Sequence, residues 1–359
     1  TGRCRLLERR KRCAMRMNPE KVLTIAIPAY NASKFLPKCL QSLVDSNELE
    51  RMEVLVIDDG SKESQDEVVR PYIDRFPQSI QMIHKENGGH GSVINKAAEI
   101  ATGKYLKILD ADDWVVSKNM KSLLDSLERL NADVVITHFD MVDAEERFRQ
   151  SFTTENVEFG KIYTMDDLAQ LPKSAYACST FHGIFYRLAF YRSTQIQMSE
   201  KVFYEDQEYA TLPFCFASGV VFLNLTIYQY LVGRPGQSVS HENQVKRLPE
   251  IKFILDSLIC FYQTHYDMSE SRKRYFQYKI GAVILSYYVA ALLKNPDRRK
   301  GRHDADALRR ELRQNSCDLM KATEKKYWIT KGLHFVHMTP DGLERIKRTH
   351  FYYILKKFI

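Results

Sequence analysis

Short apolar runs alternate with segments of helical periodicity between residues 22 and 137. The apolar runs have the length and the β-branched content of buried strands. They comprise residues 22–28, 54–57, 80–84, 105–109 and 132–137. Between them apolar residues recur at helical spacing, as in residues 35–43 and 119–130. Strands that alternate with helices of about ten residues predict an α/β fold with a parallel sheet and right-handed crossovers.

The pattern changes after Phe139. Residues 139–163 mix charged with aromatic side chains, which favours a hairpin or an insertion. Later apolar segments predict two further stretches of strand and, between them, a helix entered from residues 203–209. The strand stretches are residues 183–186 and 220–231. Beyond residue 243 the spacing is helical only, over residues 244–266, 270–294, 303–325 and a final segment to Ile359.

These patterns divide the chain into three parts. Residues 1–20 are strongly basic and have no apolar stretch of the kind a secretory signal needs. We expect them to be a disordered extension or a segment foreign to the native chain. Residues 21–240 form the α/β domain, with halves at 21–138 and 139–240, and residues 241–359 form a helical C-terminal region.

Composition narrows the class of protein. The 359 residues are 44% hydrophobic and 27% charged, an ordinary globular composition with a formal net charge of +8. That charge fits an anionic membrane surface or substrate, and without a recognised reading motif it does not predict nucleic-acid binding. The apolar run at residues 280–293 contains Ser286 and is shorter than the roughly 20 residues of a membrane span, so we predict no transmembrane helix.

Seven scattered cysteines without a C-x-x-C pair favour a reducing compartment, and we expect a cytoplasmic protein. Basic clusters such as residues 298–300 and 356–357 are typical of solvated helix faces. They also leave open peripheral contact with the inner face of the plasma membrane. A homo-oligomer formed through the helical region is a further alternative.

The most distinctive chemistry lies where the fourth strand ends. Residues 105–109 run directly into Asp110, Asp112 and Asp113. Two carboxylates about 5 Å apart repel by roughly 3 kcal/mol at an effective dielectric of 20, so such a cluster favours a bound cation. Oxygen ligands suit Mg²⁺ or Mn²⁺, and a metal held by one or two carboxylates keeps positions for substrate phosphates. The alternative is a solvated acidic turn before the helix that begins near Ser117.

Two other strand ends carry polar residues. Residues 28–30 (PAY) follow the first strand, and Asp58 and Asp59 follow the second. Ligands of open α/β sheets bind at the carboxyl ends of the strands, so these residues should meet the acidic cluster. The glycine-rich residues 87–92 (NGGHGS) match neither a Rossmann fingerprint nor a P-loop. We interpret them as a sharp turn or a close approach to a ligand.

Taken together, six short motifs resemble the family 2 glycosyltransferases of the GT-A fold. They are residues 24–31 (TIAIPAYN), 56–61 (VIDDGS), 87–89 (NGG), 103–105 (GKY), 109–113 (LDADD) and 204–206 (YED). The resemblance covers about residues 22–240 and does not extend to the helical region. It implies a nucleotide-sugar half at residues 21–138 and an acceptor half at residues 139–240.

The resemblance also implies a role for each matching residue. Pro28, Tyr30 and Asp59, with Asp58 adjacent, match positions that hold the base of a nucleotide-sugar donor. Asp110 and Asp112 match the D-x-D motif: the first usually faces the ribose, and the last holds the divalent metal. Asp113 is a substitute metal ligand.

Asp206 matches the family's general base, which takes the proton from an acceptor hydroxyl during an inverting displacement. The alternative is that Asp206 is a carboxylate that only caps the helix it begins. Relatives often carry an Arg-Asn pair after the glycine loop, where this chain has His90 and later Lys96, so the basic group that meets the donor is open. Arg234 resembles a lid position near the diphosphate, although a structural role fits a lone arginine equally well.

The expected function is therefore inverting, metal-dependent transfer of a sugar, most commonly from a UDP-sugar, to a surface-glycan or lipid-linked acceptor. Two alternatives are a sugar nucleotidyltransferase and a non-catalytic carbohydrate-binding protein on a decayed GT-A scaffold. A sugar nucleotidyltransferase would carry a Gly-rich, basic signature near the first strand, and residues 27–31 lack it. The non-catalytic alternative is weakened because Asp110, Asp112, Asp113 and Asp206 are all present. The sequence does not identify the sugar, the base, the acceptor or the linkage.

Overall fold

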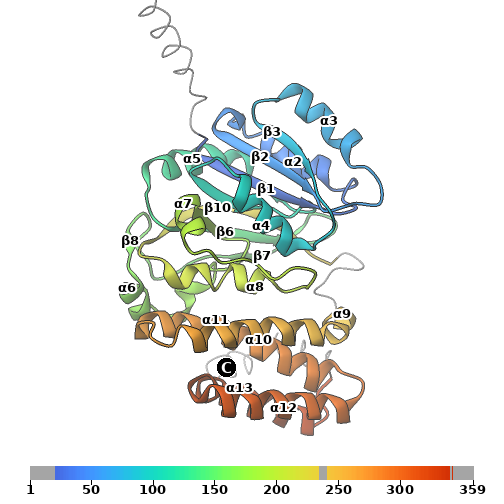
Figure 1. Cartoon of the computed structure of the whole chain (residues 1–359), viewed down its shortest axis with the longest axis vertical. Coiled ribbons are helices and arrows are strands. Elements are labelled where there is room, and N and C mark those ends of the chain that lie inside the picture. Colours follow the sequence, from blue (N-terminus) through green and yellow to red (C-terminus); the bar gives the residue numbers. More distant parts are fainter. Residues whose placement is uncertain (1–20, 234–240, 340–341, 343–359) are drawn as a thin grey trace, which may run out of the picture.

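The computed structural model describes residues 21–233, 241–339 and Gly342. The predicted basic extension at residues 1–20 and the basic pair at 356–357 lie outside the described residues. The described strands all belong to one sheet, and Figure 1 shows the part of the chain that contains them above a stack of C-terminal helices.

One mixed sheet forms the centre of the fold, in the order β3-β2-β1-β4-β9-β6-β10-β5. The strands are β1 (Leu23–Ala29), β2 (Met52–Asp58), β3 (Ile80–His84), β4 (Tyr105–Ile108), β5 (Trp114–Val115), β6 (Val134–Val142), β7 (Phe148–Phe152), β8 (Ile162–Tyr163), β9 (Ile184–Arg187) and β10 (Val220–Leu231). Strands β1 to β4 pair in parallel, as predicted. The fifth strand predicted from the sequence, at residues 132–137, is β6. It does not pair with β4, because β9 lies antiparallel between the two.

Helices follow the strands at the predicted places. The helices of the α/β domain are α2 (Leu36–Val44), α3 (Asp66–Arg75), α4 (His90–Ile100), α5 (Met120–Arg129), α6 (Met165–Gln170), α7 (Leu188–Ser193) and α8 (Asp206–Tyr209). Residues 139–163 contain β7, which pairs with β6 as the expected hairpin. The capping box at Thr164 is present, because its side chain accepts from Asp167 N–H.

The C-terminal region is helical throughout its described residues. It comprises α9 (His241–Lys246), α10 (Leu248–Thr264), α11 (Glu270–Val289), α12 (Arg298–Asn315) and α13 (Cys317–Phe335). The prediction of a single helix over residues 303–325 is wrong, because two helices cover this range. The helical path breaks at Ser316, whose extended backbone (φ −157°, ψ 83°) ends α12 and begins α13.

Helix α11 continues into a π-helical turn at Ala290–Lys294. The 25 residues of Glu270–Lys294 are long and apolar enough to cross a membrane by length and composition, in contrast to the shorter run counted from the sequence. However, 67% of the most apolar window is buried within the fold. Because α11 packs on α6, α10 and α13, its apolar residues belong to the protein core.

Candidate active site

Two adjoining cavities open at the carboxyl edge of the sheet, and Asp110, His90 and Phe203 line both. The first, of about 380 Å³, also contains side chains that follow β1, β2 and β4. These are Pro28, Tyr30, Asp59 and Asp112. The second, of about 430 Å³, contains Asp206 with neighbouring residues of α8 and of the C-terminal helices. The strand ends therefore build one cavity, and α8 builds the other.

His90 connects the two cavities. Its Nε2 lies 3.0 Å from Asp110 Oδ1, and its Nδ1 lies 2.6 Å from Glu205 Oε1. Burial opposes a charge on this ring, but the hydrogen bonds and charges of Asp110 and Glu205 outweigh it and raise the pKa of His90 well above its ordinary value. An imidazolium thus joins the strand end after β4 to the residue that precedes Asp206.

Asp113 faces β10 rather than either cavity. Its Oδ2 accepts a 2.6 Å hydrogen bond from Tyr228 Oη, and its Oδ1 accepts a 2.8 Å bond from Leu231 N–H. Tyr228 Oη also accepts from Asp110 N–H at 3.2 Å. Because both carboxylate oxygens of Asp113 have donors in the protein, its evident part in the fold is to fix the acidic turn against β10.

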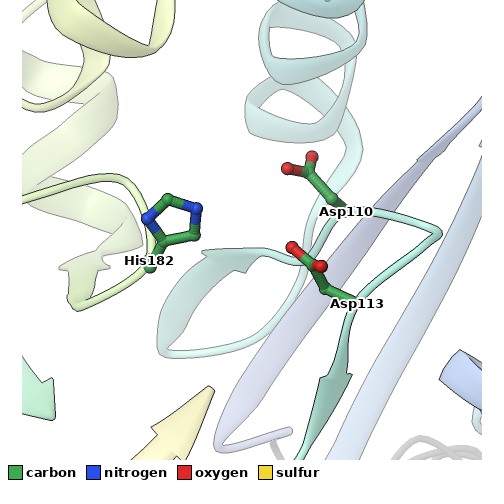
Figure 2. A group of neighbouring side chains, drawn as sticks. All are labelled: Asp110, Asp113 and His182. Atoms are coloured by element: carbon green, nitrogen blue, oxygen red, sulfur yellow. The ribbon is translucent and has the colours of Figure 1, made fainter. Parts of the chain in front are cut away.

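The acidic turn nevertheless has the donor chemistry of a metal site. Asp110, Asp113 and His182 offer ligand atoms that lie within 4.8 Å of one another, and Figure 2 shows the His182 ring facing the two carboxylates. Burial lowers the pKa of His182 to about 4, so its imidazole is neutral and able to bind a cation. Burial and the charge of Asp110 raise the pKa of Asp113 well above its ordinary value. A bound divalent cation would lower the energetic cost of ionising both carboxylates. The residues present therefore fit a divalent metal.

Lys107 lies beneath this turn, on β4. Its buried ammonium donates to the carbonyl oxygens of Phe181 and His182 at 2.7 Å and of Ile184 at 3.2 Å. Burial lowers the pKa of Lys107 to about 7, although the charges of Asp110 and Asp113 oppose that shift. Lys107 therefore holds the segment that carries His182 in place.

We expect the substitution Lys107→Met to lower the free energy of unfolding by about 3 kcal/mol or more, because it leaves buried carbonyl oxygens without donors. Urea denaturation measures the change. Lys104→Met is the matched control, because the Lys104 ammonium makes one exposed hydrogen bond, to Glu128 O. Equal stability of the two variants would contradict this role for Lys107.

Asp206 begins α8 and lines the second cavity. Burial raises the pKa of Asp206 to about 6, and the charge of Glu205 adds to the shift. Gln207 Nε2 donates a 2.8 Å hydrogen bond to Asp206 Oδ2. A carboxylate with a raised pKa that faces a cavity has the properties of a general base.

Asp59 organises the glycine loop. Its carboxylate accepts from Gly88 N–H at 3.0 Å, from Gly89 N–H at 2.8 Å and from the ammonium of Lys85 at 2.6 Å. Gly89 has φ +82° at the start of α4, which favours glycine, and a Cβ at Gly91 would lie 2.0 Å from Ser199 O. The loop is thus a sharp turn fixed by Asp59, in agreement with the first of its two interpretations.

Of the ten sequence-predicted residues, six line the two cavities and three, namely Asp58, Asp113 and Lys96, line neither. Pro28, Tyr30, Asp59, Asp110 and Asp112 line the first cavity, and Asp206 lines the second. Asp58 lies beside the first cavity, where its carboxylate accepts from Ser61 N–H at 3.1 Å and contacts His84. Arg234 lies outside the described residues.

Lys96 does not lie in either cavity. It forms an ion pair with Glu99 at 3.1 Å and lines a separate groove of about 770 Å³ between α4 and the segment around residue 195. This groove is the larger hollow, but Asp110, Asp112 and Asp206 do not line it. The basic group that sits beside Asp110 is instead His90, nearly two turns before Lys96 on the same helix.

Sequence reasoning missed the partners of the predicted residues. The sequence singles out His90 only as a departure from the family pattern, and it assigns no role in the site to Glu205 or His182. Lys107 had a usable signal, since it is a charged residue inside the apolar run at residues 105–109. Tyr228 had none, because aromatic residues are common in strands.

The mixed sheet with flanking helices, the carboxylates at its strand ends and the helical C-terminal region define an α/β protein with a helical extension, as predicted. Residues 24–191 match the family model "Glycosyl transferase family 2". This part of the chain, slightly less than half of its length, is thus similar to the glycosyltransferases of that family.

Curated relatives agree with this family. The chain is 28% identical over 193 residues to the uncharacterized glycosyltransferase MG025 homolog of Mycoplasma pneumoniae, a match that covers 52% of this chain and 59% of the relative. It is 25% identical to the uncharacterized glycosyltransferase EpsJ of Bacillus subtilis, over 58% of this chain and 60% of EpsJ. The match to glycosyltransferase GlyG of Streptococcus pneumoniae is 23% identical, over 58% and 70%. The chain thus spans about 60% of the length of the first two relatives.

Solved structures give a more distant likeness. Residues 1–349 of S. aureus TarS, in complex with UDP-GlcNAc, align over 87% of this chain and 92% of that one, with 16% identity and a TM-score of 0.48. The mannosyltransferase PcManGT from Pyrobaculum calidifontis, in complex with GDP-Man and Mn²⁺, aligns over 89% and 88%, with 13% identity and a TM-score of 0.48. At this level the likeness says nothing about the donor of the present chain.

Proposed function

We propose that this chain transfers a sugar from a nucleoside-diphosphate sugar, with UDP-sugars the first candidates, to a hydroxyl of a surface-glycan or lipid-linked acceptor, with inversion. The observation that carries the proposal is the pair of cavities that meet at Asp110 and His90. One contains the strand-end residues of a donor site, and the other contains a carboxylate with a raised pKa. An in-line displacement needs its two substrates on opposite sides of such a junction.

In the first cavity, Pro28, the half-exposed ring of Tyr30 and Asp59 are suited to hold the donor base. Asp110 and Asp112 are suited to hold Mn²⁺ or Mg²⁺ there, and Asp113 is less available because its oxygens already have donors. When bound, the metal supplies positive charge to the leaving nucleoside diphosphate. His90 keeps Asp110 ionised and oriented by its 3.0 Å contact.

In the second cavity, Asp206 takes the proton of the acceptor hydroxyl as that oxygen attacks the anomeric carbon. The oxygen–carbon bond forms while the bond from carbon to the diphosphate breaks, so the configuration inverts. Gln207 orients the carboxylate through its 2.8 Å hydrogen bond. Glu205 is engaged by His90, which leaves Asp206 as the residue suited to the proton.

The test is release of nucleoside diphosphate. The chain is incubated with Mn²⁺ and each of several UDP-, GDP- and TDP-sugars, and the free diphosphate is measured with and without simple glycosides. Metal-dependent release from one donor supports the proposal. Binding of a nucleotide sugar without any release would favour the non-catalytic alternative, and formation of a nucleotide sugar from a sugar phosphate would favour the nucleotidyltransferase.

A cytoplasmic site of action is part of the proposal. Cys39, Cys178 and Cys215 are buried free thiols, which suits a reducing compartment. Peripheral contact with the inner face of a membrane and self-association through the helical region stay predictions.

The rate of sugar transfer should fall at acidic pH. Asp206 works as the carboxylate, so with a pKa of about 6 the rate should be constant above that pH and fall about tenfold per unit well below it. The charges that face Asp206 are those of Glu205, His90, Asp110 and the ammonium of Lys279. The profile of kcat/KM against pH measures the midpoint, and a rate that stays constant down to pH 4 would contradict the assignment.

A further inference from the structure

The cavity around Asp206 is closed by the C-terminal helices. Gln244 of α9, Ile251 of α10 and a face of α11 line it opposite the acidic residues. That face carries Ala282, Val283 and Ser286, which are three and four residues apart and therefore lie on one side of the helix. The α/β domain thus supplies the catalytic carboxylate, and the helical region supplies the opposite wall.

Hydrogen bonds fix this wall to the catalytic segment. Ser257 Oγ of α10 donates to Glu208 Oε1 at 2.5 Å, and Glu208 lies two residues after Asp206 on α8. Tyr275 Oη of α11 donates to Ala210 O at 2.8 Å. The buried ammonium of Lys279 donates to Ser179 O at 2.5 Å, next to the segment that carries Phe181. These contacts hold α10 and α11 at a set distance from Asp206.

The chemistry of the lining favours a sugar ring. Aromatic side chains surround the cavity, namely Phe181, Phe203, Tyr204 and Tyr230. Aromatic faces pack against apolar C–H surfaces, and the amide of Gln207 with the Ser286 hydroxyl offers hydrogen bonds between them. An alternation of flat apolar walls and neutral polar groups suits a ligand that has both C–H faces and hydroxyls.

The charge of the lining excludes an anionic ligand. Asp110, Glu205 and Asp206 all line the cavity, and His90 is already paired with the first two. Among the described lining residues there is no lysine or arginine. Three cations lie behind the lining, and each is engaged by the protein: Lys279 donates to Ser179 O, Lys294 donates to Gln244 Oε1 at 2.6 Å, and Arg247 stacks on the Phe203 ring. A phosphate placed here would contact the carboxylates of the lining before it reached any of these cations, which disfavours an anionic ligand.

Resting on the proposed function, we infer that this cavity takes the acceptor as an uncharged sugar unit, and that the α11 face of Ala282, Val283 and Ser286 selects that unit. Phosphorylated sugars are rejected at this position. The helical region is then the acceptor-recognition part of the enzyme, and variation in α11 changes the acceptor without changing the donor.

Filling the cavity from α11 tests the location. Ala282 and Ser286 are exposed in this structure, so Ala282→Trp and Ser286→Phe need not disturb the core. Binding of p-nitrophenyl glycosides is followed by saturation-transfer NMR with UDP and Mn²⁺ present. We expect glycoside binding to weaken by about tenfold or more in both variants while UDP binding equals that of the wild type. The matched control is Ala322→Trp, at an exposed position on α13, which should bind glycosides normally.

The rejection of phosphorylated sugars is tested with the same glycosides phosphorylated at O6. The wild type should bind the uncharged forms at least about tenfold more tightly, and Ser286→Lys should narrow that preference. Three results would overturn the inference: equal or tighter binding of phosphorylated forms, unchanged glycoside binding in the filled variants, or no glycoside binding by the wild type. Failure of the proposed function has a different signature, namely no metal-dependent release of nucleoside diphosphate from any donor by the wild type.

Discussion

The substitution Asp206→Asn should lower the rate of sugar transfer by roughly 10²–10⁴-fold, the usual contribution of a general base. Asparagine has the shape of aspartate but cannot take the proton of the acceptor hydroxyl. Nucleotide binding should be unchanged, because Asp206 lines the second cavity and not the one that contains Pro28, Tyr30 and Asp112. Steady-state transfer rates and calorimetric titration with the nucleoside diphosphate measure the two effects separately.

Asp166→Asn is the control for this variant, because Asp166 is an exposed carboxylate in the first turn of α6. It should transfer at the wild-type rate. The pH profile adds a second readout: the fall near pH 6 should be absent from the residual activity of Asp206→Asn. Undiminished transfer by Asp206→Asn would remove this residue from the mechanism and leave it as a cap of α8.

Strand-end residues could be predicted because they depend on local pattern and on one rule of topology. The run that forms β1 stops at Pro28, the runs that form β2 and β4 stop at aspartates, and parallel strands place their carboxyl ends on one edge. This is why Pro28, Asp59 and Asp110 were found and do line one cavity. The α/β class and the helical region followed from periodicity in the same way.

The partners of these residues could not be predicted, because they come from distant parts of the chain. His90 and Glu205 are separated by 115 positions, and so are Asp113 and Tyr228. Such pairs depend on how α8 and β10 pack on the sheet, which no local periodicity encodes. The antiparallel position of β9 between β4 and β6 is a similar case. The side-chain pattern of a four-residue strand is the same for parallel and antiparallel pairing, so it does not predict the neighbours or the direction of β9.

The substitution Asp112→Asn should weaken metal-dependent nucleotide binding by at least roughly 30-fold. Loss of one charged ligand costs about 2 kcal/mol or more, and 1.4 kcal/mol is a factor of ten. Asp112 lines the first cavity beside Tyr30 and Ala111, so its carboxylate is close to the expected diphosphate. Calorimetric titration of UDP and other nucleoside diphosphates, with and without Mn²⁺, measures the effect. In the wild type one nucleotide should bind more tightly with the metal, and in Asp112→Asn that gain should disappear.

Two further variants decide which carboxylates hold the metal. If Asp110 and Asp112 are the ligands, His182→Ala should keep metal-dependent binding, because His182 faces Asp110 and Asp113 (Figure 2). Asp113→Asn should then lower the free energy of unfolding, since it disturbs the bonds to Tyr228 and Leu231, while the folded fraction still responds to Mn²⁺. The opposite pattern, with metal dependence lost in His182→Ala and Asp113→Asn but kept in Asp112→Asn, would move the metal to the Asp110, Asp113 and His182 group. That result would mean that the acidic turn binds its metal on the β10 side, and that the donor diphosphate reaches it from the cavity around Asp206.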